Sequence, residues 1–369
     1  MQTTAPNTSI FLPSNPKQAF EVLSSIDELL YSTNESSDDE DTCILPQLDE
    51  RSHLALVSQS VFAYLSQLER SRLVKVSSKV ANETSKWISN IFRFLDSMAS
   101  YHSNSAESLA QALRLALTSK FPTYLEQGVQ ELPKLSVYIS ENENSALLDL
   151  QYAVRIVGLP QSCIKVIPCN TVFGSPESID ASALQNQITS DVTVNIVPVF
   201  LIADLGTSFC GNVDNLVRLQ DICHKHNIWI HCRGPALTAL AVSQGSSDVK
   251  KIDSSKMICS MTLDLESWLG LPSIQTVLLY KQLPNFQSGI FDSDSNISRL
   301  SALSLWTSLQ CIGKDAITNQ FVQAFESCRI LYEIVTRMKG FRLLVSTIFK
   351  LLCHDCKSRC LFLEQKTWW

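Results

Sequence analysis

The sequence predicts an α/β protein in which helices come first and a mostly parallel sheet follows. Two observations lead to this fold class. Residues 48–117 carry apolar side chains three and four positions apart, which is the periodicity of amphipathic helices. After residue 134, short apolar runs alternate with helical stretches, and residues 196–203 are apolar without interruption, as in a strand buried on both faces. This alternation is typical of parallel sheets with helical crossovers.

Individual elements follow from the same patterns. Three helices are predicted before the sheet, at residues 54–68, 76–92 and 105–117, the last with Ser105 as its N-cap. Strands are predicted at 135–140, 163–168, 194–203, 228–231, 257–261 and 276–280, with helices at 146–157, 184–189 and 216–226. One long helix is predicted from 300 to 335, and 340–346 is a candidate for a further strand.

The predicted topology also indicates where a ligand would bind. Ligands of parallel sheets lie beyond the carboxyl ends of the strands. This rule places residues 140–145, 203–207, 231–236 and 262–268 around one crevice.

Composition divides the chain into five parts. Residues 1–46 are rich in Ser, Thr, Asn, Pro and acid, and we expect them to be disordered apart from a short helix at 16–31. We expect a helical segment at 47–133, a large α/β domain at 134–290, a long helix with the start of a truncated C-terminal domain at 291–346, and an irregular Cys-containing tail at 347–369. The acidic run at 36–41 is interpreted as a solvated linker, with a kinase site as the alternative.

Charge and hydropathy argue against several classes of protein. The net charge is -6 with both signs interspersed, which argues against nucleic acid as the main partner. The most apolar run, 196–203, is far shorter than the roughly 20 residues of a membrane helix, and the N-terminus lacks a signal-peptide pattern. The 12 cysteines are scattered singly, so we expect reduced thiols and a cytoplasmic protein.

One cysteine cluster invites a zinc interpretation. Cys353, His354, Cys356 and Cys360 lie within eight positions. Most structural zinc sites have a second, distant ligand pair, which this cluster lacks. An irregular tail is therefore the favoured interpretation, and no metal site is predicted.

Several stretches carry a family resemblance. Residues 198–203, followed by Gly206-Thr207 and by 211–214, are similar to the strand, turn and helix entry of group II pyridoxal-phosphate-dependent decarboxylases, and residues 221–231 and 299–313 resemble later parts of that family. Residues 168–175 and 268–272 resemble one subgroup of it. The resemblance implies the large domain of the aspartate-aminotransferase fold (fold type I), a homodimer, pyridoxal phosphate as cofactor and carboxy-lyase activity.

Decarboxylation with this cofactor needs four contributions from the protein. A lysine holds the aldehyde, a carboxylate keeps the pyridine nitrogen protonated, a ring stacks on the cofactor, and a glycine-rich turn binds the phosphate. The resemblance places the first three on Ser267, Arg233 and Asn144. The phosphate turn is expected between residues 117 and 134, where Gly128 is the single glycine.

These replacements argue against catalysis. Serine cannot form an imine, and Arg233 would disfavour a protonated pyridine through like-charge repulsion. The nearest lysines, Lys256 and Lys281, lie at the outer ends of the neighbouring strands. Thr207 and His231 are retained, but a turn hydroxyl and a strand-end imidazole are the favoured interpretations. We therefore predict no catalytic residue and five vestigial cofactor-binding positions: Asn144, Thr207, His231, Arg233 and Ser267.

Three functions remain open. The favoured one is a degenerate enzyme fold kept for binding or as a scaffold, because the changes fall on four separate contributions to catalysis. The second is an active carboxy-lyase that uses a lysine from elsewhere, such as the partner subunit. The third is noncovalent binding of pyridoxal phosphate with Arg233 gripping the anion, for which a rim salt bridge is the alternative. We also expect the small domain that covers the substrate to be missing, which would leave the crevice open to water.

Overall fold

The computed structural model describes most of the chain. The described residues are 49–142, 144–170, 178–207, 211–242, 258–282, 296–338, 341–343 and 363–365, together with Gln18, Phe20, Glu21 and Ser24. The chain divides into two compact units, Met1–Asp49 and Glu50–Trp369. In the helix predicted at 16–31, Phe20, Glu21 and Ser24 are helical. The acidic run at 36–41 and the cysteine cluster at 353–360 lie outside the described residues.

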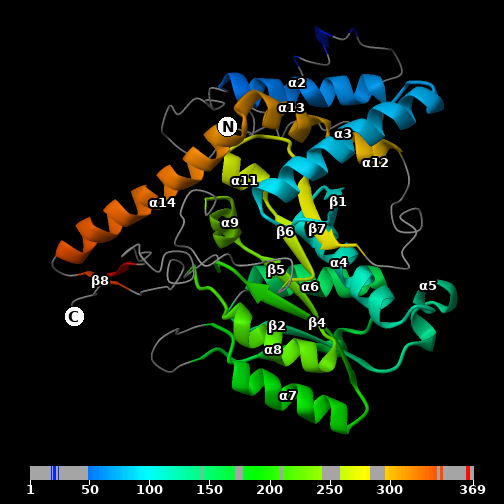
Figure 1. Ribbon diagram of the computed structural model, residues 1–369, viewed down its shortest axis with the longest axis vertical. Coiled ribbons are helices and arrows are strands. Elements are labelled where there is room, and N and C mark those ends of the chain that lie inside the picture. Colours follow the sequence, from blue (N-terminus) through cyan, green and yellow to red (C-terminus); the bar gives the residue numbers. More distant parts are fainter. Residues whose placement is uncertain are drawn as a thin grey trace, which may run out of the picture. The chain divides into compact units, whose positions relative to one another are not determined.

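The second unit is built on a seven-stranded sheet with the order β1-β7-β6-β5-β4-β2-β3 (Figure 1). Its strands are β1 (Ser97–His102), β2 (Leu135–Ser140), β3 (Ile164–Ile167), β4 (Val197–Asp204), β5 (Trp229–Arg233), β6 (Ser260–Leu263) and β7 (Thr276–Lys281). Strands β3, β2, β4, β5 and β6 are parallel, whereas β7 is antiparallel to β6 and β1 is antiparallel to β7. The predicted α/β fold with a mostly parallel sheet is confirmed.

Helices precede, connect and follow the strands. They are α2 (Glu50–Leu65), α3 (Arg70–Ile91), α4 (Ser105–Lys120), α5 (Tyr124–Gln127), α6 (Asn144–Val157), α7 (Ala181–Thr193), α8 (Leu216–His226), α9 (Thr238–Val242), α11 (Leu265–Leu269), α12 (Asn296–Leu300), α13 (Leu303–Ile312) and α14 (Lys314–Arg337). Short 3₁₀ turns are η1 (Val129–Glu131), η2 (Gln161–Cys163) and η3 (Pro235–Leu237). A separate two-stranded sheet pairs β8 (Phe341–Leu343) with β9 (Leu363–Gln365).

Three predictions about elements are wrong. Strand β1 lies inside the segment predicted to be helical, and its Ser-rich sequence lacks a strong apolar alternation. The long helix predicted from 300 to 335 is broken into α12, α13 and α14, and α13 ends at Gly313 with a φ of 77° that favours glycine. The N-cap of α4 is Asn104 rather than Ser105, because the Asn104 side chain accepts a hydrogen bond from the backbone N–H of Glu107.

Helices cover both faces of the sheet. One hydrophobic cluster joins α4 and α6 to Phe200 and Ile202 of β4, and the other joins α3, α7, α8 and α13 to Leu201 and Ala203 of the same strand. All four β4 side chains are buried, as expected for a strand inside a parallel sheet. Helix α4 precedes the domain boundary predicted after residue 133, yet its leucines belong to the core of the sheet.

Segments far apart in the sequence also pack together. Helix α2 packs on α13 and α3 packs on α12 (Figure 1). The Ser58 hydroxyl lies 2.7 Å from that of Thr307, and the rings of Trp87 and Trp306 stack with their centroids 6.3 Å apart. Among the described helices, none combines the length and hydropathy that crossing a membrane requires.

Candidate functional site

A cavity of about 140 Å³ lies at the carboxyl ends of β4, β5 and β6. It is lined by Ser105, Leu109, Asp149, Gly206, His231, Arg233, Gly234, Pro235, Thr262, Asp264 and Trp268. Parallel sheets bind ligands at this edge. Three of the four stretches predicted to surround a crevice, 203–207, 231–236 and 262–268, supply lining residues, whereas 140–145 supplies none.

Two glycines bring the loops after β4 and β5 into close contact. Gly234 has a φ of 112°, and a Cβ atom at this position would lie 2.4 Å from the carbonyl oxygen of Leu205. Gly206 has a φ of 100°, and its Cβ would lie 3.1 Å from Pro235. Side chains other than glycine would force the loops apart, so these glycines set the narrow shape of the cavity.

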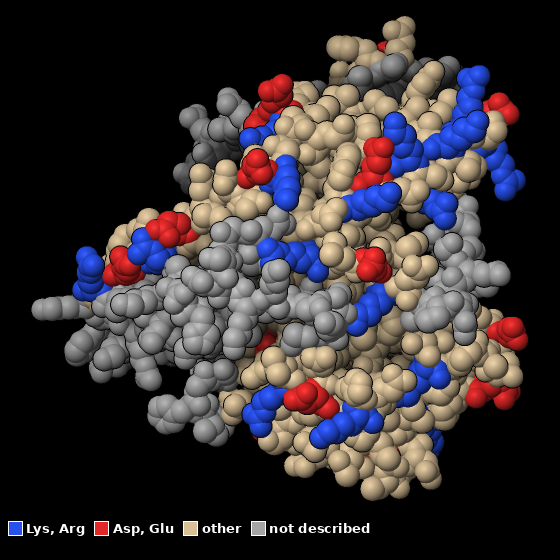
Figure 2. Space-filling model, viewed as in Figure 1, with Lys and Arg blue, Asp and Glu red and all other residues tan. Residues whose placement is uncertain are grey.

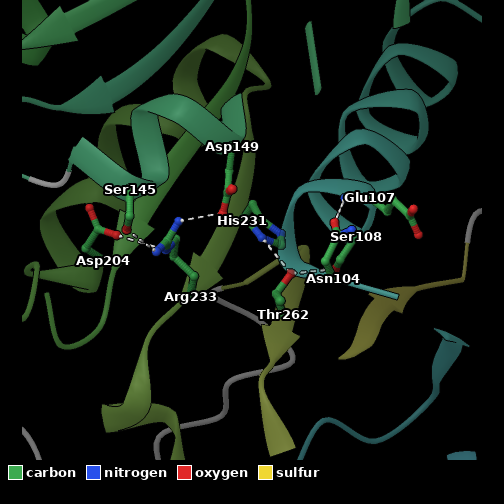
Figure 3. A network of polar contacts seen from close by, with 9 residues as sticks. All are labelled: Asn104, Glu107, Ser108, Ser145, Asp149, Asp204, His231, Arg233 and Thr262. Carbon is green, nitrogen blue, oxygen red and sulfur yellow. Dashed lines mark hydrogen bonds and ion pairs between the residues drawn. The ribbon is translucent and has the colours of Figure 1, made fainter. Parts of the chain in front are cut away.

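His231 is the centre of a buried chain of hydrogen bonds. Its Nδ1 lies 2.8 Å from the Ser260 hydroxyl, which accepts a hydrogen bond from Trp229 Nε1 at 2.8 Å. Its Nε2 lies 3.2 Å from the Thr262 hydroxyl, which in turn lies 2.7 Å from that of Ser108 (Figure 3). Both ring nitrogens are therefore engaged by protein groups.

The environment of His231 keeps its ring neutral. Burial, together with the nearby Arg233 guanidinium, lowers the pKa of His231 to about 3. In the neutral ring one nitrogen donates and the other accepts, so one of the Ser260 and Thr262 hydroxyls accepts from the ring and the other donates to it. Phe200 stacks on the ring, with centroids 5.7 Å apart.

Arg233 is held by two carboxylates. Its guanidinium lies 3.6 Å from Asp149 of α6 and 3.6 Å from Asp204 of β4, and it donates to the Ser145 hydroxyl at 3.4 Å (Figure 3). The register between β4 and β5 places Asp204 directly beside Arg233. The cation therefore lies between strand and helix acids, and its charge is balanced within the protein.

The helix that begins at this cavity is α4. Helix starts favour anions, because their first N–H groups lack partners within the helix. Here Asn104 Oδ1 accepts from the N–H of Glu107 at 2.9 Å, and Glu107 Oε2 accepts from the N–H of Ser103 at 3.1 Å. The helix start is thus capped by its own side chains and carries its own carboxylate (Figure 3).

The resemblance places a phosphate turn between residues 117 and 134, where Gly128 is the single glycine. That segment forms the end of α4, α5 and η1, and none of its residues lines the cavity. Ser105, in the first turn of α4, lines it instead. Around this helix start, the sequence Ser103-Asn104-Ser105 contains no glycine.

The other three predicted positions do not line the cavity. Ser267 is exposed and donates a hydrogen bond to Asp264 Oδ2 at 2.6 Å, while its neighbour Trp268 lines the cavity. Asn144 is exposed at the start of α6. The Thr207 hydroxyl accepts from the N–H of Asn212 at 3.0 Å, as a turn residue would. Arg233 and His231 are the two predicted positions that the structure brings together.

Two acids of the site were missed from the sequence. Asp149 and Asp204 balance Arg233, and neither resembles a motif residue. A signal for Asp204 was available, because it ends the strand next to the one that carries Arg233. Asp149 comes from the middle of α6, and no sequence pattern indicates its approach to β5.

Comparisons with known proteins show which family this chain resembles. Residues 98–236 match the pyridoxal-dependent decarboxylase conserved domain. The chain is 33% identical over 309 residues to pyridoxal-dependent decarboxylase domain-containing protein 1 of Bos taurus, which covers 82% of this chain and 38% of the bovine protein. It is 26% identical over 283 residues to aromatic-L-amino-acid decarboxylase of Bacillus atrophaeus, covering 70% of this chain and 54% of the bacterial protein.

Solved structures share the fold. The crystal structure of Catharanthus roseus tryptophan decarboxylase in complex with L-tryptophan has a TM-score of 0.70 at 15% identity, and the match covers 92% of this chain and 74% of that one. This likeness concerns the fold alone. The chain spans about two fifths of the length of its bovine relative. The matched domain, the relatives and the shared fold agree with the motifs of the sequence: this chain belongs to the pyridoxal-dependent decarboxylase family.

Proposed function

We propose that this chain is a catalytically degenerate member of its family, kept as a binding or scaffold protein. The proposal rests on the residue that occupies the position of the family's Schiff-base lysine. Ser267 stands there, exposed and hydrogen-bonded to Asp264. No lysine is among the residues that line the cavity. An aldehyde therefore has no amine to bind in this part of the chain.

Three further observations support the proposal. Arg233, which is paired with Asp149 and Asp204, stands where the family has the carboxylate that would face a pyridine nitrogen. The start of α4 is capped by Asn104 and Glu107, so the backbone N–H groups of Glu107 and Ser103 already have partners and are not available to a phosphate. The cavity of about 140 Å³ is smaller than the roughly 300 Å³ at the lower end of small-molecule sites. The residues present do not fit pyridoxal phosphate.

The active carboxy-lyase remains the alternative, with a lysine supplied from outside this cavity. The described Lys120 does not serve, because its Nζ donates to the carbonyl oxygens of Pro198, His226 and Asn227 at the opposite edge of the sheet. Noncovalent binding through Arg233 is disfavoured, because both neighbouring carboxylates already compensate its charge.

The test is a titration of the purified chain with pyridoxal phosphate. We expect no absorbance band of an internal aldimine and, after borohydride reduction, only scattered substoichiometric labelling of surface lysines in peptide mass maps. We also expect no release of CO₂ from standard amino acids. The Ser267→Lys variant serves as a matched comparison that places an amine at the family position. One lysine labelled stoichiometrically in the wild type, together with CO₂ release, would overturn the proposal.

Family members also suggest the assembly. We propose a homodimer in the cytoplasm, in line with the family and with the free thiols of Cys163, Cys223 and Cys232, which are all buried. Sedimentation velocity tests the dimer, and a monomer at micromolar concentration would contradict it.

A further inference from the structure

A second and larger cavity, of about 490 Å³, lies beside α4. Its wall includes Glu107, Gln111 and Arg114 of α4, His102 at the end of β1, and Tyr152 and Ile156 of α6. This volume falls within the range of about 300–1,000 Å³ that is typical of small-molecule sites. The cavity at the ends of β4, β5 and β6 falls below that range.

The two cavities lie on different sides of the same helix. Ser105 and Leu109, one turn apart, line the smaller cavity, whereas Gln111 and Arg114 line the larger one. At 3.6 residues per turn, Leu109 and Gln111 point in nearly opposite directions. The two cavities share no lining residue. An inference about the larger cavity is therefore independent of the proposed loss of catalysis.

Gln111 is a largely buried residue whose amide faces the larger cavity. Its side chain lines the cavity and the residue is 7% exposed, yet within the described part of the chain no group hydrogen-bonds to its amide. The amide atoms are not among the described polar atoms that are buried without a partner, so they reach the solvent in the cavity. The amide of Gln111 is thus available to a molecule in the cavity.

A cation stands next to this amide. Arg114 follows Gln111 by three positions, so the two side chains are neighbours on the helix. Arg114 is half-buried and makes no ion pair with any residue that the structure describes. Glu107, the one acid of α4, also lines the cavity, but its carboxylate accepts from the N–H of Ser103 at the helix start and forms no ion pair with Arg114. A half-buried guanidinium without a counter-ion favours an oxyanion.

His102 adds a neutral polar group to the wall. Burial, opposed by Glu107 and aided by Arg114, lowers the pKa of His102 to about 4, so the ring is uncharged at neutral pH. Its Nε2 lies 2.8 Å from the Ser100 hydroxyl. Apolar surface completes the site, since Tyr152 and Ile156 are 45% and 48% exposed. A ligand with an apolar body would cover these side chains.

We propose that this cavity binds a small organic anion. Arg114 and Gln111 hold its carboxylate or phosphate head, and Tyr152 and Ile156 pack against its apolar body. The two kinds of head share the oxyanion chemistry that a guanidinium and an amide recognise.

Calorimetric titration of the full chain tests the proposal with four probes: phenyl phosphate, benzoate, benzamide and inorganic phosphate. Phenyl phosphate and benzoate are expected to bind, and their relative affinities distinguish the two heads. Benzamide, which has the shape of benzoate without its charge, is expected to bind at least about tenfold more weakly.

Variants assign the binding to named side chains. Arg114→Met and Gln111→Leu should each weaken the anionic probes, Arg114→Met by about tenfold or more. Tyr152→Ala should weaken phenyl phosphate and leave inorganic phosphate unchanged. Arg155→Met, which removes an exposed cation of α6 outside the cavity, is the matched control and should leave every affinity unchanged. Arg114→Lys, which keeps the charge, guards against a folding defect and should bind more tightly than Arg114→Met.

Three outcomes would overturn the proposal. The first is equal binding of benzoate and benzamide. The second is an affinity for the anions that Arg114→Met does not change. The third is a wild-type protein that binds none of the anionic probes. If that protein is a dimer that becomes a monomer in Ile156→Asp, the cavity face is a subunit interface instead.

Discussion

At the scale of single residues, position 233 decides what the smaller cavity holds. A carboxylate here would stand beside Asp204 and Asp149 and repel both. Arginine instead joins them in one charge-balanced cluster. The effects of Arg233 and Asp204 on stability are therefore coupled. The free-energy cost of replacing one of them depends on whether the other is present.

Arg233→Ala should lower the free energy of unfolding by about 2 kcal/mol at pH 7, because it leaves two carboxylates without their counter-ion. This is less than a fully buried pair would lose, since the Arg233 and Asp149 side chains are 21% and 30% exposed. Burial already raises the pKa of Asp149, opposed by Arg233, so removing the arginine raises it further.

Protonation relieves this defect at low pH. The difference between Arg233→Ala and wild type in urea unfolding should therefore shrink between pH 7 and pH 4. Arg218→Ala, an exposed cation of α8, is the control and should change little at either pH. A deficit that is independent of pH would contradict the proposed role of the two carboxylates.

His231→Gln tests the neutral, structural histidine. The pKa of His231 is lowered to about 3, so the unfolded chain takes up a proton near pH 6.5 that the folded protein refuses. Stability from this residue is present above pH 6.5 and is lost as the pH falls toward 3, at up to about 1.4 kcal/mol per pH unit. The stability deficit of His231→Gln should therefore shrink as the pH falls from 7 to 4.

The comparison with wild type is needed because other buried groups titrate in the same window. His102, with its pKa lowered to about 4, acts in the same direction. Asp214, with its pKa raised to about 6 by burial, acts in the opposite direction, since its folded form retains a proton that the unfolded chain releases. His53→Gln, an exposed histidine of α2, is the control.

At the scale of elements, α4 connects most parts of the molecule. Its start adjoins the smaller cavity, its side lines the larger one, and its leucines fill the core under the sheet. Its last residue, Lys120, donates to the carbonyl oxygens of Pro198, His226 and Asn227 at 2.6, 2.8 and 2.9 Å. One ammonium thus joins the end of α4 to the end of α8 and the start of β4.

Lys120→Met should cost about 2 kcal/mol of stability, because charged hydrogen bonds to three carbonyl groups are lost. Amide hydrogen exchange should accelerate in the last turn of α8. Lys225→Met, an exposed cation in that same turn, controls for a general effect of charge at the helix end. An equal loss in both variants would argue against specific bonding by Lys120.

Helix α3 carries like charges on one side. Arg72, Lys75, Lys79 and Lys86 are exposed and fall within one narrow stripe of the helix, and Lys and Arg gather along it in Figure 2. Lys75→Glu should raise the unfolding free energy by about 1 kcal/mol at low salt, because its repulsion by Arg72 and Lys79, three and four positions away, becomes attraction. Lys75→Gln should gain less, and the gain should fade in about 1 M salt. A gain that persists at high salt would not be electrostatic.

At the scale of the whole molecule, β1 and α4 join the N-terminal segment to the sheet. We expect residues 134–369 alone to lack a cooperative urea transition, whereas 50–369 should unfold cooperatively. The shorter fragment loses Leu109, Leu113 and Leu117, which are at most 3% exposed. At about 1.5–3 kcal/mol for each buried leucine, this loss rivals the stability of about 5–15 kcal/mol of a typical domain. A cooperative transition of 134–369 by circular dichroism would support the predicted domain boundary instead.

Strongly periodic segments were predictable, and their ends were less so. Strand β2 and helix α8 match their predicted bounds, because apolar side chains repeat there with a clear period. Strand β1 was missed because an edge strand that pairs with β7 needs little apolar alternation of its own. The breaks between α12, α13 and α14 follow backbone geometry at single residues, which the apolar period does not reveal.

The sequence by itself determined the α/β class, the family, and the serine and arginine at positions 267 and 233, since these follow from periodicity and residue identity. Only the tertiary structure decided what Arg233 contacts, that Ser267 lies outside the cavity, and that a second cavity flanks α4. The physical reason is that ion pairs and cavities depend on distances between elements remote in sequence, such as α6 and β5. Those distances are set by packing of the whole core.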